Sequence, residues 1–468
     1  MAGCATLHTG HAAVAATAAK TSSKPQRRSG SPDGTRRSLH ALALPATEPI
    51  LRGVSSEPKS GRRVWLASGV VAASAAAFPI HRWLDARDVP PSGRRGALRR
   101  DPAGVLDLRE GFRYRILERS GGRMSDGGVV PIRPDGMACF DVPGEGWVLT
   151  RNHEVPLRFP CIGEPAYDPR AGGGVTRLVL DPQTLERRSS NLLLAGTAMN
   201  CSGGATPDGW LSCEEAVDSG HGFVFLCDPR AERAQPPVRL DALGRFRHEA
   251  AAYDPESGVI YLTEDRPDGC LYRFVPHRAA RPFEGRLEAL SLGPRAVDTS
   301  DWPRGRRAEV TWIALEHVTP EDDVLRHRAQ AQGAASFKRG EGACASEGAL
   351  HFCATTGGPI GAGQIFRLDG DTLEVLAAST DRAEMDMPDN VTLSPDGALF
   401  FVEDGPGHDC LRAVEPDGEV VTLARNAASE GELTGVCFSP DGRALFLNMQ
   451  EDGLTVVIEG DFAAFAPS

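Results

Sequence analysis

The sequence predicts an all-β fold: a six-bladed β-propeller over residues 101–468, preceded by a disordered targeting segment over residues 1–100. Three observations lead to this prediction. The chain contains 52 Gly and 35 Pro, and only 6% of its residues are aromatic. Such an abundance of turn formers favours many short strands over long helices. A hairpin-like unit recurs six times, and most copies are spaced as the blades of a propeller are.

The first hundred residues differ in composition from the rest. They carry 16 Lys and Arg against 5 Asp and Glu, and residues 1–60 are rich in Ala, Ser and Thr, as organelle transit peptides are. Arg62 and Arg63 precede the apolar run Val64–Phe78, whose 15 residues are too few for a membrane span. Twin arginines before such a run resemble a twin-arginine export signal. Residues 80–100 have the composition of a linker.

This leader predicts export without stable membrane insertion. We interpret it as a plastid-type transit segment followed by a thylakoid-lumen signal, because a bacterial export signal rarely begins 60 residues into a chain. A bacterial periplasmic protein with a misassigned start codon is one alternative, and a merely basic leader with an accidental apolar patch is another. The expected location is the thylakoid lumen, the plastid or the exterior in a eukaryote, and the periplasm in a bacterium.

The body of the chain is strongly acidic. Residues 101–468 carry 35 Lys and Arg against 58 Asp and Glu, a formal charge of −23. Such a surface repels phosphate backbones, so no nucleic-acid partner is expected. Concentrated carboxylates instead suit hard cations. We expect a monomer that acts on small molecules.

The repeated unit is an apolar strand, a turn with Gly, a second apolar strand and a polar or acidic residue. It occupies residues 137–154, 200–215, 248–265, 341–356, 389–405 and 433–450. The turns are typical of tight hairpins. Their glycines are Gly146, Gly209, Gly258, Gly348, Gly397 and Gly442, spaced by 63, 49, 90, 49 and 45 residues. A blade needs about 40–50 residues, so two spacings require insertions. A β-sandwich is the competing fold, but its strands seldom repeat so regularly.

In a propeller the first strand of every blade lines the axis, so the entry residues of these strands converge. The entry positions hold Asn200 with Cys201, His248 with Glu249, Arg339 with Glu341, Asp389 with Asn390, and Glu432 with Thr434. The ends of the second strands add Glu154, Glu214, Glu215, Glu264, Asp265, Glu403 and Asp404. Carboxylates this crowded cannot all stay ionised without cations. Oxygen ligands favour calcium, whereas a thiolate and an imidazole favour a transition metal such as iron or zinc.

Arg339 is the cation placed among these acids, and a guanidinium grips two phosphate oxygens at once. A substrate phosphate could therefore bridge the metals and Arg339. The sequence contains no HExxH metal motif and no GxSxG nucleophile elbow. Metal-assisted phosphate chemistry is therefore favoured over a serine hydrolase.

The motifs resemble the PhoX-type alkaline phosphatase family. The resemblance rests on NCSGGATPDGWLSCEE, GRFRHEAAAYDPESGVIYLTEDRPDGCLYRF, FKRGEG, PDNVTLSPDG and ELTGVCFSPDG, which occur in the family's order over most of residues 101–468. It implies a six-bladed propeller, a twin-arginine signal and a mixed iron and calcium cluster that hydrolyses phosphate monoesters.

By this resemblance, Cys201 ligates iron and, with Arg339, carries the catalysis; Arg339 contacts the phosphate together with Asn200. The implied carboxylate ligands are Glu214, Glu215, Glu249 and Glu341, with Glu264, Asp389 and Glu432 on the calcium side. The chain departs from the family in two ways. It is shorter than the larger members, and its last blade has NMQEDG where many relatives have His and Pro after the Gln.

Two other functions fit parts of the pattern. A calcium-dependent lactonase of the gluconolactonase type also surrounds an axial calcium with Glu, Asn and Asp, but it needs neither a thiol nor an arginine. A non-catalytic propeller that binds a partner needs no metal and would expose an apolar face at its mouth.

Overall fold

The structure is a computed structural model that describes residues 97–415 and 418–466. The predicted transit segment and the twin-arginine signal lie outside the described residues. Leu98 and Arg99, which the sequence places in the linker, form a short strand (β1) that pairs with β2 (Leu106–Arg109). In the described part of the chain, no helix has the length and apolar character needed to cross a bilayer.

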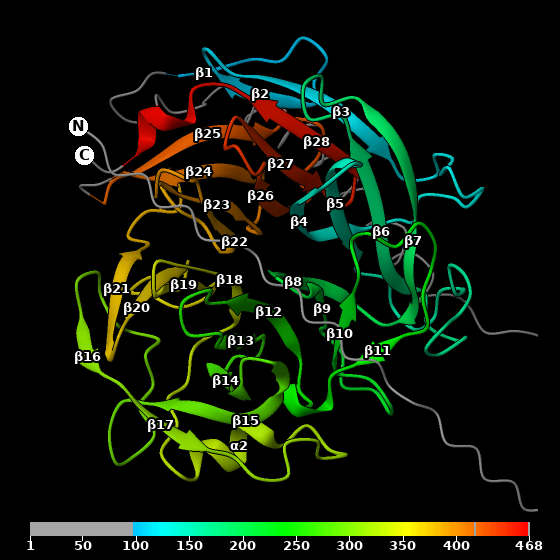
Figure 1. The fold of residues 1–468 in the computed structure, drawn as a ribbon. Helices are drawn as coiled ribbons and strands as arrows, with labels where there is room; N and C mark the ends of the chain where they lie inside the picture. The colour runs from blue at the N-terminus through cyan, green and yellow to red at the C-terminus, as the bar shows by residue number, and fades with distance from the viewer. Residues whose placement is uncertain (1–96, 416–417, 467–468) are drawn as a thin grey trace, which may run out of the picture. The chain divides into compact units, whose positions relative to one another are not determined.

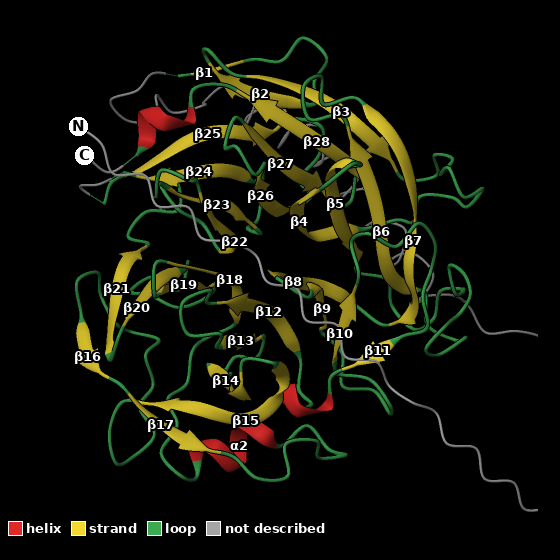
Figure 2. Cartoon of the chain, viewed as in Figure 1, coloured by secondary structure: helices red, strands yellow, loops and turns green. Residues whose placement is uncertain are grey.

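Six antiparallel sheets form the blades of a propeller, as predicted (Figures 1 and 2). The innermost strands of the blades are β4 (Pro134–Val142), β8 (Asn200–Thr206), β12 (His248–Tyr253), β18 (Gly340–Ser346), β22 (Pro388–Leu393) and β26 (Leu433–Phe438). Each of them contacts the innermost strand of the blade before and of the blade after, and β26 returns to β4. The ring is therefore closed, which leaves only short sheet edges exposed.

The first two blades have four strands each. Blade 1 consists of β4 (Pro134–Val142), β5 (Gly146–His153), β6 (Gly173–Leu180) and β7 (Arg187–Thr197). Blade 2 consists of β8 (Asn200–Thr206), β9 (Gly209–Glu214), β10 (Val224–Cys227) and β11 (Val238–Arg239), followed by the 3-10 turn η1 (Asp241–Leu243).

Blades 3 and 4 have five strands each. Blade 3 consists of β12 (His248–Tyr253), β13 (Ile260–Glu264), β14 (Tyr272–Arg278), β15 (Arg281–Ser291) and β17 (Thr311–Ala314). Blade 4 consists of β18 (Gly340–Ser346), β19 (Ala349–Ala354), β20 (Gln364–Asp369), β21 (Thr372–Ala378) and β16 (Arg307–Glu309). Helix α2 (Leu325–Gln330) lies in the long insertion between these blades. This insertion accounts for the spacing of 90 residues.

The last two blades take strands from both ends of the described chain. Blade 5 consists of β22 (Pro388–Leu393), β23 (Leu399–Glu403), β24 (Cys410–Val414) and β25 (Val420–Asn426), extended by β2 (Leu106–Arg109) and β1 (Leu98–Arg99). Blade 6 consists of β26 (Leu433–Phe438), β27 (Ala444–Met449), β28 (Leu454–Glu459) and β3 (Arg113–Arg119), followed by η2 (Phe462–Phe465).

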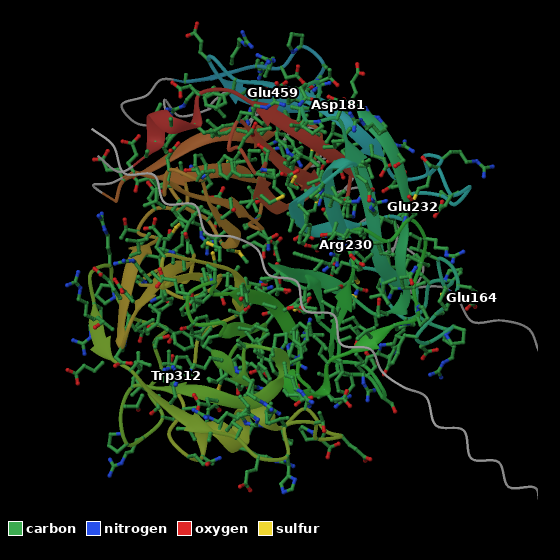
Figure 3. The ribbon with its side chains drawn as sticks, viewed as in Figure 1. Glu164, Asp181, Arg230, Glu232, Trp312 and Glu459 are labelled. Carbon is green, nitrogen blue, oxygen red and sulfur yellow. The ribbon has the colours of Figure 1, made fainter. Side chains whose placement is uncertain are left out.

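The pairing of β3 with β28 closes blade 6 with a strand from the other end of the propeller. Its register places Arg113 opposite Glu459, and their side chains form an ion pair of 3.0 Å. Figure 3 labels Glu459, the last residue of β28. Closure by β3 does not follow from the local hairpin pattern.

The six predicted hairpins are β4–β5, β8–β9, β12–β13, β18–β19, β22–β23 and β26–β27. All six turn glycines have positive φ, between 74° at Gly258 and 142° at Gly209. Residues with a Cβ rarely adopt this conformation, which is why glycine recurs at the turn. The repeat in the sequence is therefore a repeat of backbone geometry.

Candidate metal centre

A β-bulge interrupts the innermost strand near its start in every blade. The register shifts fall between Pro134 and Met137 in blade 1, between Asn200 and Gly203 in blade 2, at the equivalent place in blades 3 to 5, and one residue later, between Thr434 and Cys437, in blade 6. A bulge re-aims the side chains around it and recurs next to functional sites. The bulges thus present one side chain from each blade toward the axis.

We call these six side chains the axial ring. It consists of Asp135, Cys201, Glu249, Glu341, Asp389 and Thr434, the second residue of each innermost strand. Neighbouring side chains alternate between the faces of a strand, so the first residues point the other way. His248, for example, packs against Phe246 with ring centroids 3.6 Å apart and bonds the Gly244 carbonyl through Nε2.

A second set of side chains follows the end of the second strand of each blade. In all six blades the backbone N–H of this residue donates to the carbonyl of the residue just before the innermost strand. The set consists of Glu154, Glu215, Asp265, Thr355, Asp404 and Gln450. Four carboxylates are therefore added beside the axial ring by one repeated backbone hydrogen bond.

The residue before the innermost strand supplies the cations. Arg133, Arg247 and Arg339 occupy this position in blades 1, 3 and 4, and Glu432 occupies it in blade 6. Arg133 and Arg339 have φ of 51° and 57°, a strained conformation for residues with a Cβ. Such strain persists only where the surroundings impose it and is concentrated at functional sites.

Each arginine is paired with a carboxylate from the second set. Arg133 contacts Glu154, Arg247 contacts Glu215, and Arg339 bonds both oxygens of Asp265 at 2.9 and 3.2 Å. Arg339 Nη2 also lies 2.7 Å from Glu341 Oε1. The acids outnumber the arginines. The axial ring, the second set and the residues before the innermost strands together contain nine carboxylates and three guanidinium groups.

Two groups of side chains have ligand atoms close enough to share an ion. The first is Glu154, Cys201 and Glu215, and the second is Glu249, Glu341 and Asp389; within each group the atoms lie within 4.8 Å of one another. The first group contains a thiol, whereas the second contains only carboxylates. A thiolate suits iron or zinc, and an all-oxygen set suits calcium.

The buried carboxylates of the axial ring and of the positions beside it repel one another and form one cluster. Burial and the charges of Glu341, Glu215, Asp389 and Asp135 raise the pKa of Glu249 well above its usual range. Burial, then Glu154, raises the pKa of Asp135 to about 8. The pKa values of Glu215, Glu341, Asp389 and Glu432 are raised in the same way.

Cys201 belongs to this cluster. Burial and the charges of Asp135, Glu249, Glu215 and Glu154 hold the pKa of its thiol well above the ordinary value. Its Sγ lies 3.6 Å from Asp135 Oδ2. Without a cation this thiol stays protonated, whereas a bound metal ion would deprotonate it.

Several buried polar atoms of the cluster have no hydrogen-bond partner. They include both carboxylate oxygens of Glu249, which is fully buried, and Oδ1 of Asp135. A buried carboxylate without a partner is costly unless it is neutralised or coordinates a metal. The donor set and these unpartnered oxygens therefore fit bound metal ions.

The structure brings together seven of the predicted site residues: Cys201, Glu215, Glu249, Glu341, Asp389, Glu432 and Arg339. Three predicted residues face elsewhere. Asn200 donates to Ser212 Oγ at 2.8 Å and accepts from Thr197 Oγ1 at 2.7 Å, so its amide is held inside blade 2.

Glu214 and Glu264 also point into their blades. Glu214 accepts hydrogen bonds from the N–H groups of Ala198 and Gly222, at 2.9 Å each, and contacts His221 Nδ1 at 2.7 Å. Glu264 accepts from Cys270 N and Tyr272 Oη. Each is followed by an acid that faces the cluster, because consecutive residues point in opposite directions. Their carboxylates are therefore bonded inside the blades and not at the axis.

Asp135, Arg133 and Arg247 are members of the site that the sequence did not predict. Asp135 accepts a hydrogen bond of 2.7 Å from Gln450 Nε2 besides its contact with Cys201. For Arg133 and Arg247, the signal was the recurring position before the innermost strand, which also holds Arg339.

The fold and this cluster define a six-bladed propeller with an axial centre suited to metal ions. The family model for alkaline phosphatase PhoX matches residues 93–181 and 169–453. The chain therefore belongs to the PhoX alkaline phosphatase family, which implies that it is a metal-dependent phosphatase.

The first of two similar solved structures supports the fold. Pseudomonas fluorescens PhoX in complex with vanadate, a transition state analogue, superposes with a TM-score of 0.59 at 19% identity over 78% of this chain and 97% of that chain. A gluconolactonase from Xanthomonas campestris, XC5397, gives a TM-score of 0.44 at 13% identity over 80% and 99% of the two chains. No curated protein matched this sequence.

Proposed function

We propose that residues 101–468 form the catalytic domain of a phosphomonoesterase that hydrolyses small phosphate esters at an axial iron and calcium centre. The observation that carries the proposal is the contact of Arg339 with Glu341, whose ligand atom lies within 4.8 Å of those of Glu249 and Asp389. A cation-binding carboxylate group and a guanidinium side by side suit a phosphate dianion.

Arg339 has the geometry for this role. Its Nε and Nη2 are bonded to Asp265, which fixes the plane of the guanidinium. Among residues 97–415 and 418–466, Nη1 has no hydrogen-bond partner, so it remains open to a phosphate oxygen. Asp265 stays ionised to hold Arg339, because the bonds from Arg339 lower its pKa although burial alone would raise it.

The ligands fall into two classes. Cys201, with Glu154 and Glu215, would hold iron, and Glu249, Glu341 and Asp389 would hold calcium, with Glu432 and Asp135 beside them. Such ions, when bound, polarise phosphoryl oxygens and lower the pKa of water. The chain itself binds and orients the phosphate through Arg339 and keeps the acids buried away from bulk solvent.

We further propose that the protein is exported through the twin-arginine signal and acts as a monomer on soluble substrates. The acidic composition of residues 101–468 supports a small-molecule substrate over nucleic acid. Relative rates on phosphomonoesters and a phosphodiester would test the ester class, and faster turnover of the diester would contradict it.

Replacing Cys201 with Ala is expected to lower turnover of p-nitrophenyl phosphate about 10²-fold, because loss of a metal ligand weakens metal binding and activity. The rates should be measured with iron and calcium present. Cys344→Ala is the matched control, since Cys344 also lies on an innermost strand but its pKa is raised by burial alone, not by acids. Equal rates in the wild type and Cys201→Ala would end the proposal.

A further inference from the structure

The insertion between blades 3 and 4 contacts the loop that follows Asp265. Strand β13 ends at Glu264, and residues 265–269 form this loop. The insertion contributes α2 and the residues that lead to β18, ending at Lys338. Because Asp265 and Arg339 flank the two segments, contacts between them bear directly on the candidate site.

Side chains from α2 form one half of these contacts. Arg326 donates from Nε to Asp268 Oδ1 at 2.9 Å and from Nη1 to Asp323 Oδ1 at 2.7 Å. Nη1 also lies 3.7 Å from Glu264 Oε1. Gln330 donates to the Asp268 carbonyl at 2.5 Å. Arg326 is only 8% exposed, so its guanidinium is held by these contacts and is largely shielded from solvent.

Backbone hydrogen bonds form the other half. Phe337 N donates to the Gly269 carbonyl at 2.8 Å, and Arg339 N donates to the Arg266 carbonyl at 2.9 Å. The second bond holds Arg339 where its φ is 57°. The Arg266 side chain pairs with Asp323, which Arg326 also bonds. The same loop therefore fixes the backbone of Arg339 and, through Asp265, its guanidinium.

We propose that the contact between α2 and loop 265–269 is a clasp that positions Arg339 for phosphate, with Arg326 as its positioning residue. This inference rests on the proposed function, because it assigns Arg339 to phosphate. Arg326 bonds Asp268 of the loop and Asp323 of the insertion. In the contacts described, it touches neither Arg339 nor the axial ring. Its effect must therefore pass through residues 265–269.

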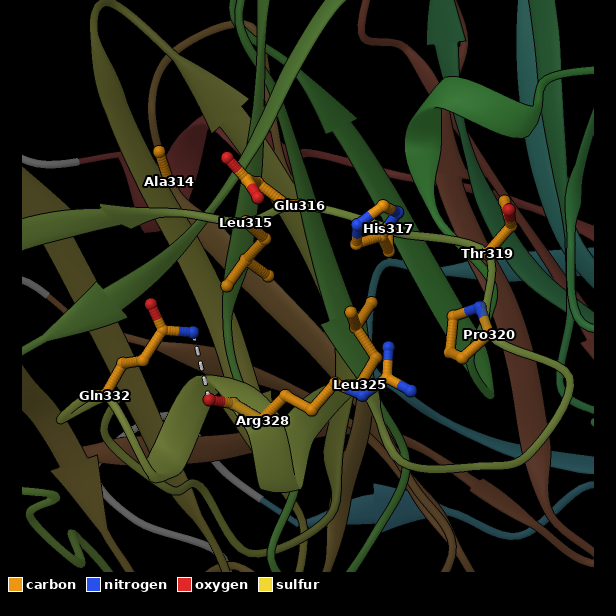
Figure 4. A pocket seen from close by; sticks show the side chains of 9 residues that line it. All are labelled: Ala314, Leu315, Glu316, His317, Thr319, Pro320, Leu325, Arg328 and Gln332. Atoms are coloured by element: carbon orange, nitrogen blue, oxygen red, sulfur yellow. Dashed lines mark hydrogen bonds between the residues drawn. The ribbon is translucent and has the colours of Figure 1, made fainter.

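The other face of α2 supplies a control. Arg328 lies two residues further on, is exposed, and lines a pocket of about 800 Å³ with His317 and Pro320 (Figure 4). The one hydrogen bond drawn in this view joins Gln332 to the Arg328 carbonyl, at 3.1 Å. Arg328→Met therefore removes a guanidinium from the same helix without loosening the clasp.

The test compares Arg326→Met, Asp268→Asn and Arg328→Met. Asp268→Asn weakens the clasp from the loop side at a half-exposed residue, so it keeps the test valid if Arg326→Met does not fold. Both clasp variants are expected to lower kcat/KM for p-nitrophenyl phosphate about tenfold with unchanged metal content. The reason is that a small displacement of the Arg339 guanidinium from the phosphate slows the reaction. They should also speed hydrogen exchange in peptides covering Phe337–Glu341. Arg328→Met should change neither quantity.

The two readouts separate the clasp from the proposed function. A wild type without phosphatase activity would overturn the proposed function, while hydrogen exchange would still decide whether the clasp holds Arg339. Unchanged exchange at Phe337–Glu341 in both clasp variants would overturn the clasp. Faster exchange and a lower melting temperature with unchanged kcat/KM would also overturn it, because the contact would then be merely structural.

Discussion

Replacing Glu249 with Gln is expected to lower phosphatase turnover at least about 10³-fold, equivalent to about 4 kcal/mol of activation free energy, and to stabilise the metal-free protein. Glu249 is fully buried, and neither carboxylate oxygen has a hydrogen-bond partner. In the metal-bound protein such a carboxylate is a strong ligand. In the metal-free protein it lowers the free energy of unfolding, because it is buried and Glu341, Glu215 and Asp389 repel its charge.

The sign of the change in unfolding free energy of the metal-free protein distinguishes a metal ligand from a structural acid: replacing the ligand stabilises this protein, whereas replacing the structural acid destabilises it. Glu214→Gln is the matched control, because Glu214 is equally buried but accepts hydrogen bonds from backbone N–H groups and contacts His221. We expect Glu214→Gln to lower the unfolding free energy by about 1–3 kcal/mol and to keep most of the activity. Melting temperatures in chelator at pH 8 would measure both variants. A destabilised metal-free Glu249→Gln protein would contradict the assignment.

The second large effect is a loss of stability of the metal-free protein as the pH rises. Burial and neighbouring acids raise the pKa of Asp135 to about 8, and burial raises that of Asp404 to about 6. An acid with a raised pKa in the folded state binds a proton there that the unfolded chain has already lost. Stability therefore falls between the unfolded pKa, about 3.8, and the folded value.

Between pH 5.5 and 8.5 we expect the metal-free protein to lose at least about 2 kcal/mol of unfolding free energy, since one pKa unit corresponds to about 1.4 kcal/mol. Denaturant unfolding in chelator at both pH values would measure this loss. Added calcium should restore more stability at pH 8.5 than at pH 5.5, because it binds the ionised carboxylates. If the protein in chelator were as stable at pH 8.5 as at pH 5.5, or more stable, the claim that these buried acids have raised pKa values would be contradicted.

The hairpins were predictable because their signal is local. Each turn glycine has the positive φ that its position requires, and the apolar segments on both sides form the strands. The pairing of β3 with β28 was not predictable in this way. Its partners are more than 300 residues apart, and nothing in either segment specifies the other.

The axial ring was predictable in five blades and missed in one for a geometric reason. In blades 2 to 6 the ring residue precedes the turn glycine by seven to nine residues, as Cys201 precedes Gly209. In blade 1 the hairpin is longer, and Asp135 precedes Gly146 by eleven residues. Alignment on the turn therefore did not reach Asp135.

The acid pairs at the strand ends show a different limit. Glu214 and Glu215 are chemically equivalent in the sequence, but only Glu215 faces Cys201. Strand alternation dictates that the two point apart, whereas the register that decides which one faces the axis depends on the bulge in the neighbouring strand. The same rule turns Asn200 away from the centre and Cys201 toward it.

Elemental analysis of the purified mature protein tests most directly whether the crowded axial acids and Cys201 hold cations. We predict both iron and calcium bound in stoichiometric amounts, with iron reduced in Cys201→Ala and retained in Cys344→Ala. Calcium without iron would contradict the role of the thiol and favour a lactonase-type centre, and a protein purified without either metal would contradict the account as a whole.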